Sequence, residues 1–465
     1  MRTTNSRIAL GLLLLATTAS AAPRAARNKT ALDRYVYTPD PAFQYKLVNT
    51  IKAPGVTTYV LDMTSQRWKT EQEVDRPVWQ HWVQVIVPEQ VQSSIGLLVI
   101  NGGSNRPDPP KSADTVLVGV ARQTRSIVTN LRQIPNEPLR FKDENRGRTE
   151  DEIIAYTWDK FLRTGDDTWP LRLPMTKAAV RAMDTAAAFC AETVKQKVDR
   201  FVVAGGSKRG WTTWTTAAVD DRVIAIAPFV IDALNGEKSF EHHFRSYGFW
   251  APAIQEYVDM RIMEWAGTPQ HRALMKIEDP YSYRDRLTMP KLIVNATGDQ
   301  YFLPDSSRFY FDGLQGEKHL RYVPNAKHDL NGSDALMSLA AFYEEIVSGK
   351  PRPRYTWKFE KDGSIVAAAQ DKPLEVKLWQ ATNPKARDFR LDSIGKAFTG
   401  SALQPDAKGR YVARVARPPQ GWTAFLIEFT FPGAGAIPLK VTSGVRIAPD
   451  VLPAKAPTRK MGIGG

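Results

Sequence analysis

A serine flanked by glycines ends an apolar run at residues 201–211, which read FVVAGGSKRGW. Serine hydrolases present their nucleophile in this way, at a sharp strand-to-helix turn that exposes the hydroxyl group. Gly205 allows the strand and the helix to approach closely, and N–H groups at the start of the helix are suited to bind an oxyanion. The segment predicts a nucleophile elbow with Ser207 at its tip.

One position departs from the usual G-x-S-x-G pattern of this turn. Arg209 stands where the second glycine is expected, and Gly210 follows one residue later. A Gly-Gly-Ser triplet is also common in ordinary turns. The assignment of Ser207 therefore depends on finding a base and an acid elsewhere in the chain.

Histidine is the usual base for a serine nucleophile, and only one of the six histidines is placed for that role. His328 follows the strand expected near residues 321–324, in a loop at the carboxyl edge of the sheet. The order Ser…Asp…His along the chain predicts a histidine at this place. The other histidines lie within or before predicted elements: His81, His242, His243, His271 and His319.

The acid that orients this histidine should leave the preceding strand, predicted at residues 291–297. That strand ends in Thr-Gly-Asp, which makes Asp299 the candidate. Its carboxylate would hold the tautomer of His328 and stabilise the imidazolium. Asp232 is the alternative, because it follows the neighbouring strand at residues 223–231.

An oxyanion hole requires two N–H donors near Ser207. The N–H group of Lys208 follows the serine directly, and the second donor should come from the loop after the strand at residues 95–100. That loop contains Gly102 and Gly103, which leave the backbone accessible.

The elements around these residues alternate between strands and helices from residue 95 to residue 347. This alternation predicts an α/β class of fold, with a largely parallel sheet covered on both faces and sites at the carboxyl ends of its strands. Residues 30–350 form this unit in our interpretation. Residues 235–287 interrupt it with a mostly helical insertion that is rich in aromatic residues.

We expect the insertion to act as a cap over the site. Five of its aromatic residues either shape the substrate pocket or pack the cap on the core: Phe244, Tyr247, Phe249, Trp250 and Trp265. A peptidase that recognises a free amino terminus would need a carboxylate near the serine, and Glu237 and Glu241 are the candidates.

The pattern changes after residue 353. Residues 355–450 show short alternating strands and turns with little helical periodicity, which predicts a β-sandwich. The last residues, 451–465, contain prolines, lysines and glycines, and we expect a disordered tail.

The first residues have the features of an export signal. Arg2 and Arg7 precede an apolar run, and small residues follow at a cleavage site near residue 21. The chain has one cysteine, Cys190, which excludes an internal disulfide and, in an apolar helical stretch, is typical of a core residue. We therefore expect signal-peptide cleavage after residues 1–21 and a secreted or periplasmic protein without stable membrane insertion.

Composition limits the classes of partner and cofactor. The formal net charge is +14, but the basic residues are spread thinly, so we expect no nucleic-acid binding and regard an anionic cell-surface polymer as a possible partner. The sequence contains no Walker loop, G-x-G-x-x-G or H-E-x-x-H motif. We expect no cofactor and no metal site.

Four segments together resemble the PhoPQ-activated pathogenicity-related protein family. They are GGSKRGWTTW at residues 205–214, AYTWDKFL at 155–162, WPLRLPMTK at 169–177 and NATGDQYF at 295–302. The resemblance spans about residues 35–449. It implies an α/β-hydrolase fold, export and a triad of Ser207, Asp299 and His328, and it makes the arginine after the serine a feature of the family.

The sequence therefore predicts an exported serine hydrolase that cleaves ester or peptide bonds of a small-molecule substrate through an acyl-enzyme. The alternative is a secreted, virulence-associated interaction protein that keeps the hydrolase scaffold with little or no catalysis.

Overall fold

The computed structural model describes residues 30–105 and 108–457. The predicted signal peptide at residues 1–21 lies outside the described residues.

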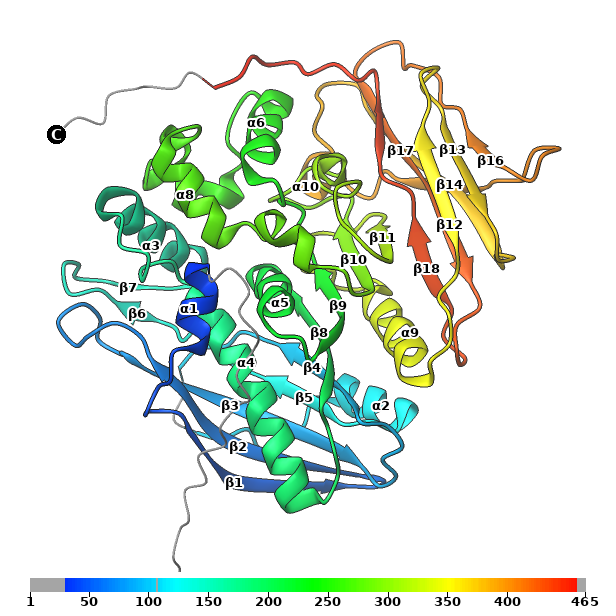
Figure 1. The fold of residues 1–465 in the computed structure, drawn as a ribbon. Helices are drawn as coiled ribbons and strands as arrows, with labels where there is room; N and C mark the ends of the chain where they lie inside the picture. Colours follow the sequence, from blue (N-terminus) through cyan, green and yellow to red (C-terminus); the bar gives the residue numbers. More distant parts are fainter. Residues whose placement is uncertain (1–29, 106–107, 458–465) are drawn as a thin grey trace, which may run out of the picture.

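A nine-stranded sheet forms the centre of the molecule (Figure 1). Its strands, in spatial order, are β1 (Gln44–Ala53), β2 (Val56–Arg67), β3 (Val78–Pro88), β5 (Val128–Leu131), β4 (Ile95–Ile100), β8 (Arg200–Gly206), β9 (Val223–Phe229), β10 (Lys291–Ala296) and β11 (Lys318–Val323). Strands β1, β2, β3 and β5 pair antiparallel, and the pairs from β5 to β11 are parallel. The parallel strands are short and almost wholly buried, as expected for a sheet covered on both faces.

Helices cover both faces of the sheet. The helices of one face are α1 (Ala31–Tyr37), α4 (Arg172–Phe189) and α5 (Lys208–Val219), and those of the other are α2 (Thr115–Thr124) and α9 (Ala335–Ser348). A short π-helix after α4 begins at Cys190, which is fully buried. Burial raises the pKa of the Cys190 thiol to about 12, which makes it a core residue rather than a nucleophile.

The helical insertion lies between β9 and β10, above the carboxyl ends of the parallel strands (Figure 1). It contains three α-helices and three 3₁₀ segments: α6 (Gly236–Tyr247), η2 (Pro252–Ile254), α7 (Gln255–Asp259), η3 (Ile262–Trp265), α8 (Pro269–Glu278) and η4 (Pro280–Arg286). Helix α3 (Glu150–Thr164) leaves the main unit and packs against α7 and α8. The cap is thus joined to the sheet through β9 and β10 and is also packed against α3.

Two antiparallel sheets form the C-terminal β-sandwich. One contains β12 (Tyr355–Phe359), β13 (Ile365–Ala369) and β16 (Tyr411–Ala413); the other contains β15 (Thr399–Ala402), β14 (Glu375–Asn383), β17 (Trp422–Phe431), β18 (Leu439–Thr442) and β19 (Arg446–Ala448). Strand β18 lies against β11 and α9, and the backbone N–H of Tyr322 donates to Oγ1 of Thr442 at 3.0 Å. The sandwich therefore shares its core with one face of the large sheet.

The chain after the sandwich differs from the expected disordered tail as far as residue 457. The Val451 carbonyl accepts a hydrogen bond from Nε1 of Trp422, and the N–H of Ala454 donates to the carbonyl of Arg245 in α6, each at 3.0 Å. Residues 458–465 lie outside the described part. Across residues 30–105 and 108–457, no helix is long and apolar enough to cross a membrane.

Candidate active site

Ser207 lies at the turn between β8 and α5, as the sequence predicted. Its backbone has φ 56° and ψ −128°, a region that residues other than glycine rarely adopt. Its N–H group donates to the carbonyl of Phe229 at 2.9 Å, which ties the turn to the end of β9. Strain of this kind concentrates at functional sites because the surrounding structure must maintain it.

Two glycines permit the turn. A Cβ atom on Gly205 would lie 2.6 Å from the carbonyl oxygen of Arg209, and a Cβ atom on Gly210 would lie 2.8 Å from the carbonyl oxygens of Gly205 and Phe229. In the usual motif, the glycine that allows helix and strand to approach is the second residue after the serine. Here it is the third, Gly210. The departure at Arg209 thus leaves the elbow intact.

The side chain of Arg209 is used to hold the neighbouring loops. Its two terminal nitrogens donate to the carboxylate of Glu150 at 3.0 and 2.8 Å, and Nε donates to the carbonyl of Ile134. A Cβ atom on Gly102 would collide with this guanidinium. Arg209 therefore connects the elbow helix to the loop after β4 and to the start of α3.

His328 and Asp299 lie together, in the loops that follow β11 and β10. Nδ1 of His328 is 2.8 Å from Oδ2 of Asp299, and the other carboxylate oxygen accepts the N–H groups of Tyr301 and Phe302 at 2.8 and 3.3 Å. These bonds fix the carboxylate, so Nδ1 of the imidazole carries the proton and Nε2 is left as the acceptor. Nε2 is buried and has no hydrogen-bond partner among the described residues.

Asp232, the alternative acid, lies elsewhere. It is buried, and its carboxylate accepts the hydroxyl groups of Tyr310 and Tyr322, each at 2.6 Å. Burial raises the pKa of Asp232 to about 8, with a smaller contribution from the nearby carboxylates of Asp299 and Asp305. This residue is a structural acid beneath the site rather than a partner of His328.

Asp232 makes a testable contribution to pH-dependent stability. Because its pKa is raised on folding, the folded state holds this proton more tightly, and stability falls as pH rises from about 4 to about 8. Asparagine does not titrate. We expect the melting temperature of the wild type to fall between pH 5 and pH 8 relative to that of Asp232→Asn, measured by differential scanning calorimetry; parallel curves for the two proteins would contradict this origin.

Two cavities reach Ser207. The first lies between the ends of β4 and β8 and the start of α9, and His328, Leu330 and Leu336 line it. The second lies beneath the cap, and its aromatic wall is formed by Trp158, Trp211, Phe240, Tyr257, Tyr301 and Phe302. The serine and the imidazole thus share the wall of one cavity.

The five cap aromatics expected to shape the substrate pocket line neither of these cavities. Phe244 and Trp250 pack on each other with ring centroids 5.0 Å apart, and Tyr247 stacks on Phe249 at 5.6 Å, beside Arg390. Trp265 is buried in the core of the cap. Helix α6 presents Phe240 to the site instead, and its next turn packs on other parts of the cap.

The residues proposed for an oxyanion hole lie at the start of α5 and in the loop that packs on Arg209. Lys208 is the first residue of α5. Gly102 lies against the guanidinium of Arg209, and the next residue of that loop, Gly103, has φ 124°. The Gly102 carbonyl accepts the N–H of Gln133 at 3.1 Å, which fixes the direction of this loop. The structure therefore places the Gly102 segment against the side chain of Arg209, in the first turn of the helix that follows Ser207.

No sequence pattern indicates the charged cluster at the start of α5. Nζ of Lys208 lies 2.5 Å from Glu150 and 3.1 Å from Asp151, in the first turn of α3. Burial opposes ionisation of Glu150, but Arg209 and Lys208 outweigh it and lower the pKa to about 2. Burial and the charge of Glu150 raise the pKa of nearby Glu137 to about 7.

Other predicted residues lie away from the serine. Glu237 and Glu241 line a separate cavity of the cap. His319 lies within β11, not before it. Among the described residues, no group of three or more histidine, cysteine, aspartate or glutamate side chains is arranged to hold a metal ion.

The profile of the PhoPQ-activated pathogenicity-related protein family matches residues 32–390, which is more than half of the chain. The chain belongs to this family. It is also similar to autocrine proliferation repressor protein A of Dictyostelium discoideum, at 39% identity over 453 residues and with 91% of each chain covered.

Solved structures with similar folds include two acetyl xylan esterases. The one from a Paenibacillus species has a TM-score of 0.49 at 15% identity and covers 70% of this chain and 96% of its own. The one from a Thermoanaerobacterium species has a TM-score of 0.46 at 15% identity, with 68% and 92% covered. In this member of the PhoPQ-activated family, the strand order, the elbow and the cap position make an α/β-hydrolase scaffold with an added β-sandwich.

Proposed function

We propose that this protein is an exported serine hydrolase that cleaves ester or amide bonds of small-molecule substrates through an acyl-enzyme. The observation that carries the proposal is the arrangement around one cavity: a strained Ser207, and His328 with Nδ1 bonded to Asp299 and Nε2 without a partner among the described residues. An imidazole in this state is prepared to accept a proton from a hydroxyl group.

In the proposed reaction, Oγ of Ser207 attacks the substrate carbonyl carbon and passes its proton to Nε2 of His328. Asp299 keeps Nδ1 protonated and stabilises the imidazolium. N–H groups of Lys208 and of the Gly102–Gly103 segment bind the oxyanion. When the bond to the leaving group breaks, that group takes the proton from His328, and water then releases the acyl group by the reverse sequence.

The export part of the proposal depends on the leader at the N-terminus. A secreted or periplasmic location would bring the basic surface into contact with anionic polymers of the cell envelope, which we propose as a second kind of partner. The cleavage site can be checked by N-terminal sequencing of protein recovered from a bacterial periplasmic fraction, which should begin near residue 22.

A fluorophosphonate probe tests the catalytic part of the proposal. We expect it to label the wild type, and to leave Ser207→Ala unlabelled although that variant is folded. Absence of labelling in folded wild-type protein would contradict the proposal. A panel of acyl esters and aminoacyl amides then distinguishes an esterase from a peptidase.

Arg209 should support this chemistry indirectly. Lysine in its place keeps the charge but loses the two-pronged bond to Glu150 and the contact with the Gly102 segment. Because displacement of a catalytic group by about 1 Å can cost about 10²-fold in rate, we expect Arg209→Lys to lower kcat/KM by about 10- to 100-fold. Wild-type kinetics in this variant would show that Arg209 does not position the site.

A second candidate function is suggested by the relative with 39% identity, whose name describes repression of proliferation. On that hypothesis, the protein acts by binding a partner and uses the hydrolase scaffold with little or no catalysis. The two candidates differ in one result, because a binding function would survive Ser207→Ala and a catalytic one would not.

A further inference from the structure

The two cavities at Ser207 differ greatly in size. The one shared with His328 has a volume of about 460 Å³, and the one beneath the cap about 30 Å³. The smaller cavity therefore admits a much smaller group than the larger one. The larger is accessible, because Leu336 in its wall is 51% exposed.

The two parts of a substrate can be assigned to these cavities. In acyl transfer the leaving group must receive its proton from the histidine, and the carbonyl oxygen must lie at the oxyanion donors. His328 lines the larger cavity and Lys208 lines the smaller one. The leaving group therefore belongs in the large cavity, on the side of His328, which leaves the small cavity for the acyl chain.

The walls of the small cavity are fixed in place. Trp158 is 2% exposed, and its ring lies 5.8 Å from that of Trp211 and 5.3 Å from that of Tyr257, centroid to centroid. The hydroxyl of Tyr257 donates to Asp151 at 3.0 Å, and Asp151 also pairs with Lys208 at 3.1 Å. Because this carboxylate already has two partners, the cavity suits an uncharged acyl chain better than an ammonium group.

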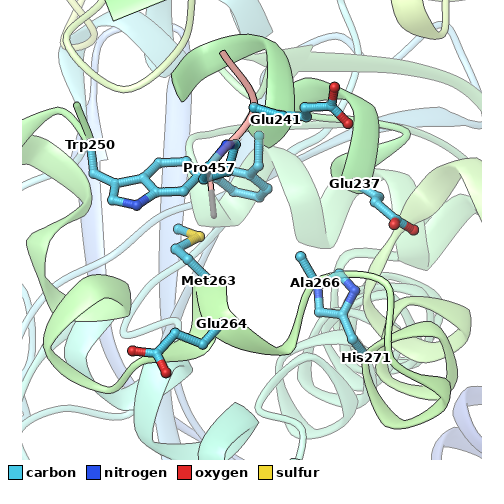
Figure 2. Close-up of a pocket in the computed structure, with 10 residues that line it drawn as sticks. Glu237, Glu241, Trp250, Met263, Glu264, Ala266, His271 and Pro457 are labelled. Carbon is cyan, nitrogen blue, oxygen red and sulfur yellow. The ribbon is translucent and has the colours of Figure 1, made fainter. Parts of the chain in front are cut away.

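Phe240 separates the small cavity from a neighbouring one. The neighbour has about 110 Å³ and lies between α6, η3, α8 and the chain near Pro457; Figure 2 shows Trp250, Met263 and His271 around it. Phe240 is the single residue that lines both cavities. Its ring therefore marks the far end of the space open to an acyl chain.

We infer that the substrates are esters of short acyl groups on a bulky alcohol, and that Phe240 sets the upper limit of acyl length. The inference rests on the proposed function and narrows its substrate class. Removal of the Phe240 ring should join the two cavities and admit longer chains.

The test compares p-nitrophenyl acetate, butyrate and octanoate as substrates of the full chain. For the wild type we expect kcat/KM for acetate and butyrate to agree within about tenfold, and that for octanoate to be at least about 100-fold lower. Phe240→Ala should raise the octanoate-to-acetate ratio by about tenfold or more, and Phe240→Leu should raise it less. The leucine variant replaces the alanine variant if the latter does not fold.

Phe244→Ala is the matched control, because Phe244 lies one turn further along α6 and lines neither cavity. It should leave the chain-length ratio unchanged. Wild-type protein that cleaves octanoate as fast as acetate, or a Phe240 variant with an unchanged ratio, would overturn the inference. If the protein takes up the fluorophosphonate in either case, the proposed function stands; a folded protein with neither labelling nor hydrolysis contradicts both.

Discussion

Ser207→Ala should abolish hydrolysis, with kcat/KM for p-nitrophenyl acetate falling by about 10⁵- to 10⁶-fold. The reason is that Ser207 is the proposed nucleophile, and no other group is expected to form the acyl-enzyme. Alanine fits the space of serine in the strained turn, so the fold should be retained. The measurement is initial-rate kinetics with p-nitrophenolate release, together with the melting temperature of both proteins.

The residual hydrolysis rate of Ser207→Ala tests the contribution of the oxyanion donors. The oxyanion donors remain in the alanine variant, so the rate should stay above that of the uncatalysed reaction. A variant that keeps one tenth or more of the wild-type activity would show that hydrolysis occurs at another group.

Asp299→Asn should lower kcat/KM by about 10⁴-fold, the second largest effect. The 2.8 Å bond between Asp299 and Nδ1 of His328 selects the tautomer in which Nε2 can accept the serine proton. An asparagine amide placed there can donate to Nδ1 and favour the opposite tautomer. The same kinetic assay checks this result.

Asp232→Asn is the matched control for this experiment. Its carboxylate is bonded to Tyr310 and Tyr322 and not to the histidine, so activity should stay within about threefold of wild type at a temperature where both proteins are folded. If Asp232→Asn were the inactive variant and Asp299→Asn the active one, the proposed acid would be wrong.

The large sheet and the placement of Ser207, Asp299 and His328 at its carboxyl edge could be predicted because they depend on chain order alone. In a parallel sheet all carboxyl ends lie at one edge, so residues that directly follow β8, β10 and β11 must meet there. The choice between Asp232 and Asp299 needed coordinates, because both follow strands of this sheet. The carboxylate of Asp232 accepts hydrogen bonds from the hydroxyl groups of Tyr310 and Tyr322, which are remote from it in sequence.

The lining of the small cavity was harder to predict. We predicted an aromatic cap from the sequence and assigned Phe244 and its neighbours to the substrate pocket. In the structure, Phe240 lines the cavity at the serine instead. Phe240, Phe244 and Tyr247 share one face of α6, at i, i+4 and i+7, and the periodicity does not show which turn of that face reaches the serine. Trp158 and Tyr301 come from outside the insertion, and no local pattern connects them to it.

The charged cluster at Lys208 and Arg209 is another feature that could not be predicted from the sequence. Its carboxylates, Glu150 and Asp151, begin α3, where acidic residues are already expected because they stabilise the helix N-terminus. Their sequence position therefore has an ordinary explanation. Only the structure shows that they also neutralise the two cations next to the elbow.

The most direct test of the account is to locate a fluorophosphonate adduct by tandem mass spectrometry of the digested wild-type protein. We expect one phosphonyl group, on Ser207 and on no other residue. An adduct on a different side chain, or none on folded protein, would contradict it.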